Sequence, residues 1–135
     1  MALLKEDNVY THIVAIDFGT GASGYGIAAK HSEAGQPPRI EVFNPCDESD
    51  DQKTSTAILF SDDGQFLAFG TQALSMYAEM LDDEETAMLF QNYKLHLLRL
   101  DKDAISMDSR TLNLMKVISE SLRFIADKAI EKLTE

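Results

Sequence analysis

The chain has 135 residues, a length that suits one domain at most. Its 44% hydrophobic and 26% charged residues are typical of a soluble globular protein and not of a disordered one. The formal net charge of -11 argues against unaided binding to nucleic acid or anionic lipid, which need a positive field, so any polyphosphate must be held locally by backbone N–H groups and a metal ion.

Three strands are predicted near the N-terminus. The continuous apolar run 13–16 is typical of a strand buried on both faces. Apolar residues then alternate with small or polar ones, first over 25–29 and again over 39–44. We expect residues 13–17, 25–29 and 39–44 to form an antiparallel meander.

A loop and a hairpin are predicted next. Residues 46–55 read CDESDDQKTS and are expected to form an acidic loop. The apolar segments 56–60 and 65–70 flank a turn that contains Asp63-Gly64. Asp-Gly is a strong hairpin signal because glycine accepts a positive φ, so the two segments are expected to pair.

The second half of the chain is predicted to be helical. From Thr71 onward apolar residues recur three or four positions apart, as on one helical face. The acidic run 82–85 is typical of a helix N-terminus, so a second helix is expected from there to Leu98. A long final helix over 111–133 is predicted to run almost to the last residue without a C-cap, with one apolar face made of Leu114, Ile118, Leu122, Ile125, Ala129 and Leu133.

The stretch AIDFGTGASGYGIAAKH (15–31) contains Gly19-x-Gly21-x-x-Gly24, the spacing of a dinucleotide-binding loop. A dinucleotide loop must lead into a helix, yet Gly26 follows and the apolar residues step by two, as in a strand. A Walker loop is excluded because no Lys-Ser/Thr pair follows the last glycine. The pattern instead indicates a strand, an Asp-x-Gly-Thr segment, a glycine-rich turn and a second strand.

Such a hairpin carries groups that suit phosphate. The backbone N–H groups from Gly19 to Gly21 can form an anion nest, and the Thr20 hydroxyl can donate to a phosphate oxygen. Asp17 would repel a bare phosphate, so its position makes sense if a hydrated magnesium ion stands between them. The residues alone also suit an ordinary glycine-rich β-turn in which Asp17 bonds to its own backbone.

Four motifs in order carry a family resemblance. VAIDFGTGASGYGIA resembles the first phosphate motif of the superfamily that contains actin, sugar kinases and heat-shock ATPases. TSTAILFSDDGQFLAFGTQAL (54–74) is similar to the heat-shock 70 kDa chaperones, in which a Thr-x-Ser/Thr strand, a hairpin and a helix start follow in that order. Ser23-Gly24-Tyr25, LFQNYKLHLL and the final helix are most similar to the heat shock 70 kDa protein 12A/12B branch, and the resemblance covers nearly the whole chain from about Ile13.

The resemblance implies roles for the matching residues. Asp17 would bind magnesium through water, while Gly19 and Thr20 would contact the β- and γ-phosphates of ATP in a cofactor-binding loop that includes Gly21. Lys94, in NYKLHLL, falls near the catalytic lysine that positions the attacking water; a surface lysine with its stem on apolar neighbours is the alternative. Gly21 and Ala22 stand where relatives have hydroxyl residues, which removes phosphate donors and bears on hydrolysis more than on binding.

The resemblance also implies the fold class: α/β, the N-terminal lobe of an RNase-H-like (actin-like ATPase) fold, with an antiparallel β-meander followed by a hairpin and helices, incomplete. Residues 10–60 would hold the meander and acidic loop, 61–110 an inserted subdomain, and 111–135 a truncated helix. The second phosphate loop, the second metal-orienting Asp and the adenosine pocket have no counterpart before Glu135. We therefore expect a chain that binds ATP and Mg2+ and does not turn over alone, with protein clients or the rest of the ATPase domain as partners.

A non-catalytic interaction module is the alternative function. In the full superfamily fold the apolar face of helix 111–133 would pack against strands that this chain lacks. We therefore expect that face to be exposed and available to a partner.

The remaining residues indicate the compartment. Cys46 is the single cysteine, so an intrachain disulfide is impossible and a reducing compartment is favoured. Residues 1–12 lack a signal-peptide core, and no apolar run approaches the roughly 20 residues of a membrane span. His12, His31 and His96 lack metal-ligand spacing with any cysteine or acidic pair. We expect a cytoplasmic, chaperone-like stress protein without nucleic-acid or membrane partners.

Overall fold

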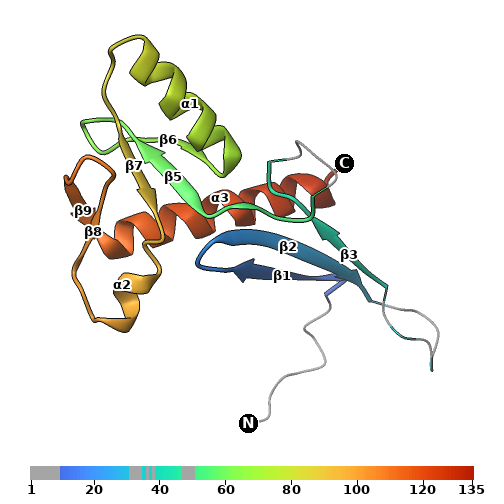
Figure 1. The fold of residues 1–135 in the computed structure, drawn as a ribbon. Coiled ribbons are helices and arrows are strands. Elements are labelled where there is room, and N and C mark those ends of the chain that lie inside the picture. The colour runs from blue at the N-terminus through green and yellow to red at the C-terminus, as the bar shows by residue number, and fades with distance from the viewer. Residues whose placement is uncertain (1–9, 31–34, 36, 38, 47–50) are drawn as a thin grey trace.

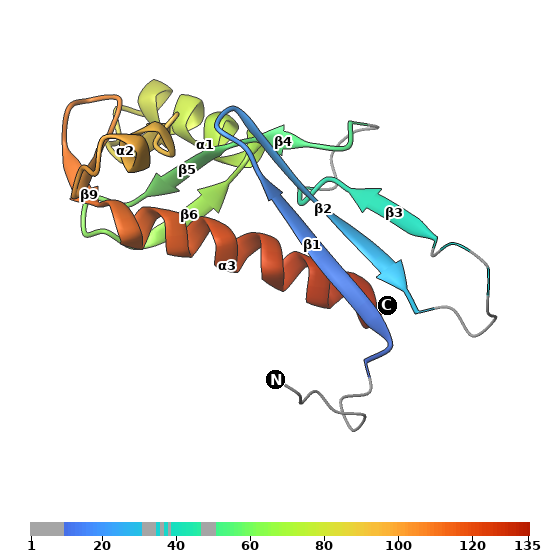
Figure 2. The ribbon, with the colours of Figure 1, turned by 90° about the horizontal axis from the view of Figure 1, so that it is seen from below.

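The structure is a computed structural model that describes residues 10–30, 35, 37, 39–46 and 51–135. Two small antiparallel sheets and a short hairpin are joined by one long helix, α3 (Leu114–Leu133), which packs against elements of all three (Figure 1). In the perpendicular view α3 runs beneath the second sheet and alongside the first (Figure 2). The helix therefore connects the parts of the fold that lie on either side of it.

The first sheet confirms the predicted meander, but the expectation that its first strand is buried on both faces is wrong, because residues 12–17 are all exposed. Strands β1 (His12–Phe18), β2 (Ala22–Ala29) and β3 (Ile40–Phe43) are antiparallel neighbours in that order, with β1 at the edge. The glycine-rich stretch thus begins a strand and not a helix, which excludes the dinucleotide-loop interpretation. A short strand, β4 (Thr54–Ser55), pairs with the first two residues of β2. Four of the ten residues of the predicted acidic loop, 47–50, lie outside the described residues, and its last two form β4 rather than a loop.

The second sheet has its most buried strand at the centre. Strand β5 (Ala57–Phe60) lies between β6 (Phe66–Phe69) and β7 (Met88–Gln91), and all four of its residues are buried. The predicted hairpin is confirmed as β5–β6. One face of β5 packs on α1 (Thr71–Asp82), and the other face packs on α3. A continuous apolar run is what burial on both faces requires.

The predicted helix from 82 to 98 is wrong. Residues 82–85 form the end of α1 and the turn after it, where Glu84 has a φ of 58°. The chain then enters β7, and only α2 (Leu95–Leu98) is helical before the hairpin β8 (Asp103–Ile105) and β9 (Thr111–Asn113). The segment AMLF has four consecutive buried residues, because it pairs with β5 and its alternate side chains pack into the clusters on the two faces of the sheet. Acidic residues usually mark a helix N-terminus, so their place at a helix end misled the prediction.

The final helix is confirmed, but the expectation that its apolar face is exposed is wrong for four of the six residues named, and among these six only Leu122 and Leu133 are exposed. Asn113 caps its N-terminus by accepting the Lys116 N–H at 3.1 Å. The face packs on both sheets of the same chain, and its buried residues are Leu114, Val117, Ile118, Ser121, Ile125 and Ala129. At the other end the Thr134 hydroxyl donates to the Glu131 carbonyl at 2.9 Å. An interaction module that uses this face is therefore not supported.

Gly70 is the position where the fold needs glycine most. It precedes α1 with a φ of 75°, and an added Cβ would lie 2.5 Å from both Cys46 Sγ and Thr54 Oγ1. We expect Gly70→Ala to lower the free energy of unfolding by about 2 to 5 kcal/mol, because backbone strain and overpacking add. Urea denaturation measures the loss.

Gly64→Ala is the matched control. Gly64 has a similar φ of 81°, but its added Cβ would meet the flexible end of Lys116 at 3.3 Å and make an ordinary contact with Leu112 Cδ2 at 3.8 Å. This variant should lose only the strain component, about 1 to 2 kcal/mol. Equal losses in the two variants would show that the close approach at Gly70 is unimportant.

Candidate functional site

The predicted phosphate-binding loop, residues 19–21, is the turn between β1 and β2. Asp17 is the second-last residue of β1 and pairs with Gly24. The Gly19 N–H donates to the Ala22 carbonyl at 3.1 Å, so it is already used within the turn and the predicted nest lacks this donor. Gly21 is exposed, and the half-buried Thr20 hydroxyl makes no hydrogen bond to any residue in the described part of the chain. The groups that remain for a ligand are the Thr20 hydroxyl and the Thr20 and Gly21 N–H groups.

Thr56 holds this turn in place by two hydrogen bonds. Its N–H donates to the Gly21 carbonyl at 3.0 Å, and its hydroxyl donates to the Gly19 carbonyl at 2.8 Å. A hydroxyl has one proton, so the 2.6 Å contact with buried Ser23 must have Ser23 Oγ as the donor. Both ends of the turn are therefore held by one residue between β4 and β5.

Asp17 is paired with a lysine that the sequence analysis did not single out. Lys53 Nζ lies 2.5 Å from Asp17 Oδ2, with the two side chains 47% and 60% exposed. Lys53 passes over Gly24, where an added Cβ would lie 2.8 Å from the Gln52 carbonyl and 3.2 Å from Lys53 Cγ. The absence of a side chain at position 24 therefore allows Lys53 to reach the carboxylate.

Lys94 reaches the loop from a distant part of the chain. Lys94 Nζ donates to the Phe18 carbonyl at 2.6 Å, although 76 residues separate the two. Its ammonium also lies 5.7 Å from the centre of the Phe18 ring, within the range of a cation–π contact. Lys94 thus lies at the end of β1, next to the loop, and its catalytic role stays a prediction.

The sequence analysis missed two residues of the site, Thr56 and Lys53. Thr56 was noted only within a motif of the resemblance, and Lys53 was assigned to an acidic loop. Lys53 is the last residue before the Thr-Ser-Thr segment, and β4 pairing with β2 places that segment beside the loop. A positive charge directly before a strand was the one available signal, and it does not identify the partner.

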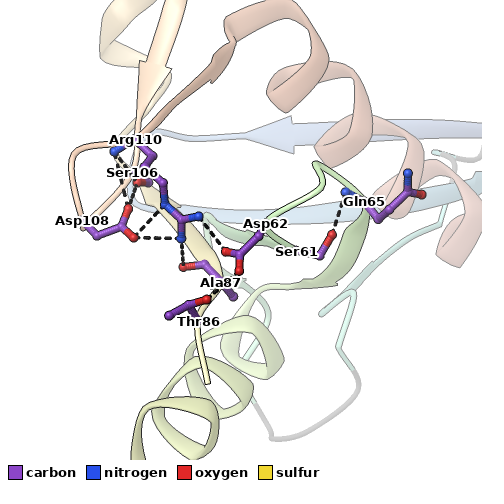
Figure 3. A network of polar contacts seen from close by, with 8 residues as sticks. All are labelled: Ser61, Asp62, Gln65, Thr86, Ala87, Ser106, Asp108 and Arg110. Carbon is purple, nitrogen blue, oxygen red and sulfur yellow. Dashed lines mark hydrogen bonds and ion pairs between the residues drawn. The ribbon is translucent and has the colours of Figure 1, made fainter. Parts of the chain in front are cut away.

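A second group of charges lies far from the loop along the chain and joins three turns. The Arg110 guanidinium stands between two carboxylates, 2.6 Å from Asp62 and 2.8 Å from Asp108 (Figure 3). It also donates to the Ala87 carbonyl at 3.0 Å, and the Thr86 hydroxyl donates to Asp62. These contacts join the β5–β6 turn, the start of β7 and the β8–β9 turn, which indicates a structural role.

The same contacts shift two pKa values. Hydrogen bonds from Arg110 and Ser106 lower the pKa of Asp108 from 3.8 to about 2. Hydrogen bonds from Thr86 and Arg110 lower the pKa of Asp62 below 3.8. In both cases hydrogen bonding favours the ionised carboxylate more than desolvation opposes it.

The fold indicates a class of protein, and comparisons with known proteins then identify relatives. The mixed α/β fold and the loop are consistent with a fragment of an actin-like ATPase. The chain is 31% identical over 137 residues to heat shock 70 kDa protein 12B of Homo sapiens, covering 93% of this chain and 19% of that protein. Over 142 residues, 98% of this chain and 20% of each relative, it is 26% identical to heat shock 70 kDa protein 12A of Mus musculus and 25% identical to that of Homo sapiens.

The resemblance to the 12A/12B branch is therefore confirmed by homology along nearly the whole chain. The chain spans about a fifth of the length of the curated relatives it matches. No protein-family profile and no solved structure matches it. Among the described residues, no helix is both long and apolar enough to cross a bilayer.

The lowered pKa values of the Arg110 cluster predict an acid-sensitive contribution to stability. A carboxylate with a depressed folded-state pKa stabilises fully above its unfolded pKa, near 4, and loses this effect as the pH falls toward about 2. The difference in urea midpoint between wild type and Arg110→Gln should therefore be largest above pH ~4 and shrink toward pH ~2. Arg123→Gln, which removes an exposed guanidinium 3.9 Å from Glu120, controls for the lost charge. A difference in urea midpoint that stays the same from pH ~7 to pH ~2 would contradict the acid-sensitive contribution.

The Thr56 hydroxyl is predicted to stabilise the loop. Thr56→Val keeps the side-chain shape but leaves the buried Ser23 hydroxyl without its acceptor, at a cost of about 1 to 3 kcal/mol in the free energy of unfolding. Adding Ser23→Ala removes that unpaired group, so the double variant should lose less than the sum of the single losses. Urea denaturation of all four proteins closes the double-mutant cycle, and strict additivity would show that the two hydroxyls do not interact.

Proposed function

We propose that this chain is a nucleotide-binding part of a heat-shock-70-like ATPase and holds the phosphates of ATP at the loop 19–21. The observation that carries the proposal is the hydrogen bond from Lys94 Nζ to the Phe18 carbonyl, because it places an ammonium at the loop across 76 residues of sequence. Homology to the 12A/12B branch supports nucleotide binding by ancestry. Thr20 supplies a hydroxyl without a partner among the described residues.

The residues present fit magnesium held through water. Asp17 is a single, largely exposed carboxylate, and among the described residues no group of three His, Cys, Asp or Glu side chains could hold a metal directly. A hydrated Mg2+ needs few protein ligands, since it keeps several of its waters. When bound, the ion would supply positive charge between Asp17 and the phosphates, which a chain of net charge -11 otherwise repels.

Each residue of the loop then has a distinct part in binding. Asp17 orients the hydrated ion, Thr20 donates its hydroxyl to a phosphate oxygen, and Gly21 keeps the approach to the backbone open, with no atom within 4 Å of the position of an added Cβ. Lys94 adds an ammonium and is the proposed catalytic lysine. A chaperone role and protein clients stay predictions from the resemblance, and a cytoplasmic location stays a prediction from the sequence.

Titration calorimetry of ATP into the chain, with and without Mg2+, tests the proposal. We expect binding near a Kd of about 1 mM, or roughly -4 kcal/mol, and only with Mg2+. Asp17→Asn should abolish it, because the carboxylate that orients the ion is gone. Thr20→Ala should weaken it about fivefold, the value of one neutral hydrogen bond near 1 kcal/mol.

Asp63→Asn is the matched control. It changes the net charge by the same amount in the β5–β6 turn, and Asn-Gly suits such a turn as well as Asp-Gly does. This variant should bind as wild type does. Tight binding that needs no Mg2+ and persists in Asp17→Asn would contradict the proposed site.

A further inference from the structure

Lys53 forms an ion pair with Asp17, the residue whose carboxylate is proposed to orient magnesium. Its ammonium lies 2.5 Å from Asp17 Oδ2, and both side chains are about half exposed. Two cations compete for one carboxylate, because the ammonium and a hydrated ion would both bind its oxygen atoms. The ion pair is at the surface, so breaking it requires little desolvation and little free energy.

The position of Lys53 is fixed by its neighbours, although its side-chain end is exposed. Thr54 is buried, and the pairing of β4 with β2 places it beside Ser23. Figure 2 shows β4 next to β2. On the other side the backbone at Gln52 passes close over Gly24. The backbone therefore holds Lys53 over β2, while its flexible four-carbon stem leaves the ammonium free to turn.

There is room for a ligand beside this pair. Asp17 and Lys53 line an open pocket of about 390 Å³ on the face of the first sheet. The loop begins two residues after Asp17, about 7 Å along an extended strand, which a lysine side chain can cover. Lys94 binds the Phe18 carbonyl at the same end of β1. One ammonium group thus lies on Asp17 and a second lies on the Phe18 carbonyl, next to the loop.

We propose that Lys53 is a second lysine of the phosphate site, kept on Asp17 in the free protein and transferred to a phosphate oxygen when Asp17 engages the hydrated ion. The inference rests on the proposed function and deepens it. Lys53 is a positioning residue for the metal and a binding residue for the phosphate. It keeps Asp17 from standing as an uncompensated negative charge at the loop, and it makes metal and nucleotide binding mutually dependent.

Lys53→Gln separates these two effects because they have opposite signs. Without nucleotide, the variant should bind Mn2+, used as a spectroscopic substitute for Mg2+, about two- to fivefold more tightly than wild type, the range of an exposed ion pair. Electron paramagnetic resonance of free Mn2+ measures this. With Mg2+ present, the same variant should bind ATP about two- to fivefold more weakly by calorimetry, because one phosphate ligand is lost. A role limited to folding the loop would weaken both.

Two controls complete the experiment. Lys102→Gln removes one positive charge from an exposed residue that precedes β8, so it reports the effect of net charge alone. Asp17→Asn combined with Lys53→Gln should remove the gain in Mn2+ affinity, since the gain depends on the freed carboxylate. Thermal unfolding of Lys53→Gln should stay close to wild type because exposed pairs contribute little.

The outcomes distinguish this inference from the proposed function. If wild type binds no ATP in the presence of Mg2+, the proposed function fails and the inference fails with it. If wild type binds Mg-ATP and Lys53→Gln matches Lys102→Gln in both titrations, only the role of Lys53 is overturned. A change of the same sign in both titrations also overturns it. Tighter Mn2+ and weaker ATP binding in the one variant support it.

Discussion

The hydrogen bonds of Thr56 determine how the two sheets and the loop are placed relative to one another. Thr56 is the one residue between β4 of the first sheet and β5 of the second. Its N–H and hydroxyl bind the Gly21 and Gly19 carbonyls, so the β1–β2 turn is fixed at the junction of the sheets. Since β5 is buried between α1 and α3, the turn is attached to the most constrained strand in the described part of the molecule.

The neighbouring residue Thr54 extends the same arrangement to α1. Its hydroxyl accepts the Thr71 N–H at 2.9 Å, at the first residue of the helix. Gly70, which precedes the helix, has no side chain of its own for capping and packs closely on Thr54. The Thr56 and Thr54 hydroxyls thus bind half-buried backbone groups of the loop and of α1.

The electrostatics of the molecule divide into a structural part and a part available to a ligand. The Arg110 cluster joins three turns, and both of its carboxylates bind the one guanidinium. At the loop, in contrast, Asp17 is matched by only one exposed ammonium, and the Thr20 hydroxyl has no partner among the residues that are described. Buried Tyr93 belongs to neither part: burial raises the pKa of its phenol, whose oxygen lies 2.5 Å from Ser121 Oγ. The candidate site is therefore marked by the exposed Asp17–Lys53 pair, which a ligand can replace, and not by the more extensively bonded Arg110 cluster.

Local patterns in the sequence were sufficient for the elements whose partners are adjacent in the chain. The meander, the β5–β6 hairpin and α3 follow from periodicity and turn residues, and Asp17-x-Gly19-Thr20 follows from the same reading of the hairpin. Periodicity shows which side of an element is apolar, but it does not show what covers that side. This is why the sequence analysis did not predict that residues 88–91 form a strand beside β5. It is also why the analysis did not predict that most of the apolar face of α3 packs on its own chain. Only the tertiary structure places Lys53 on Asp17 and Lys94 at Phe18, because contacts 36 and 76 residues apart depend on the path of the whole chain and not on local propensity.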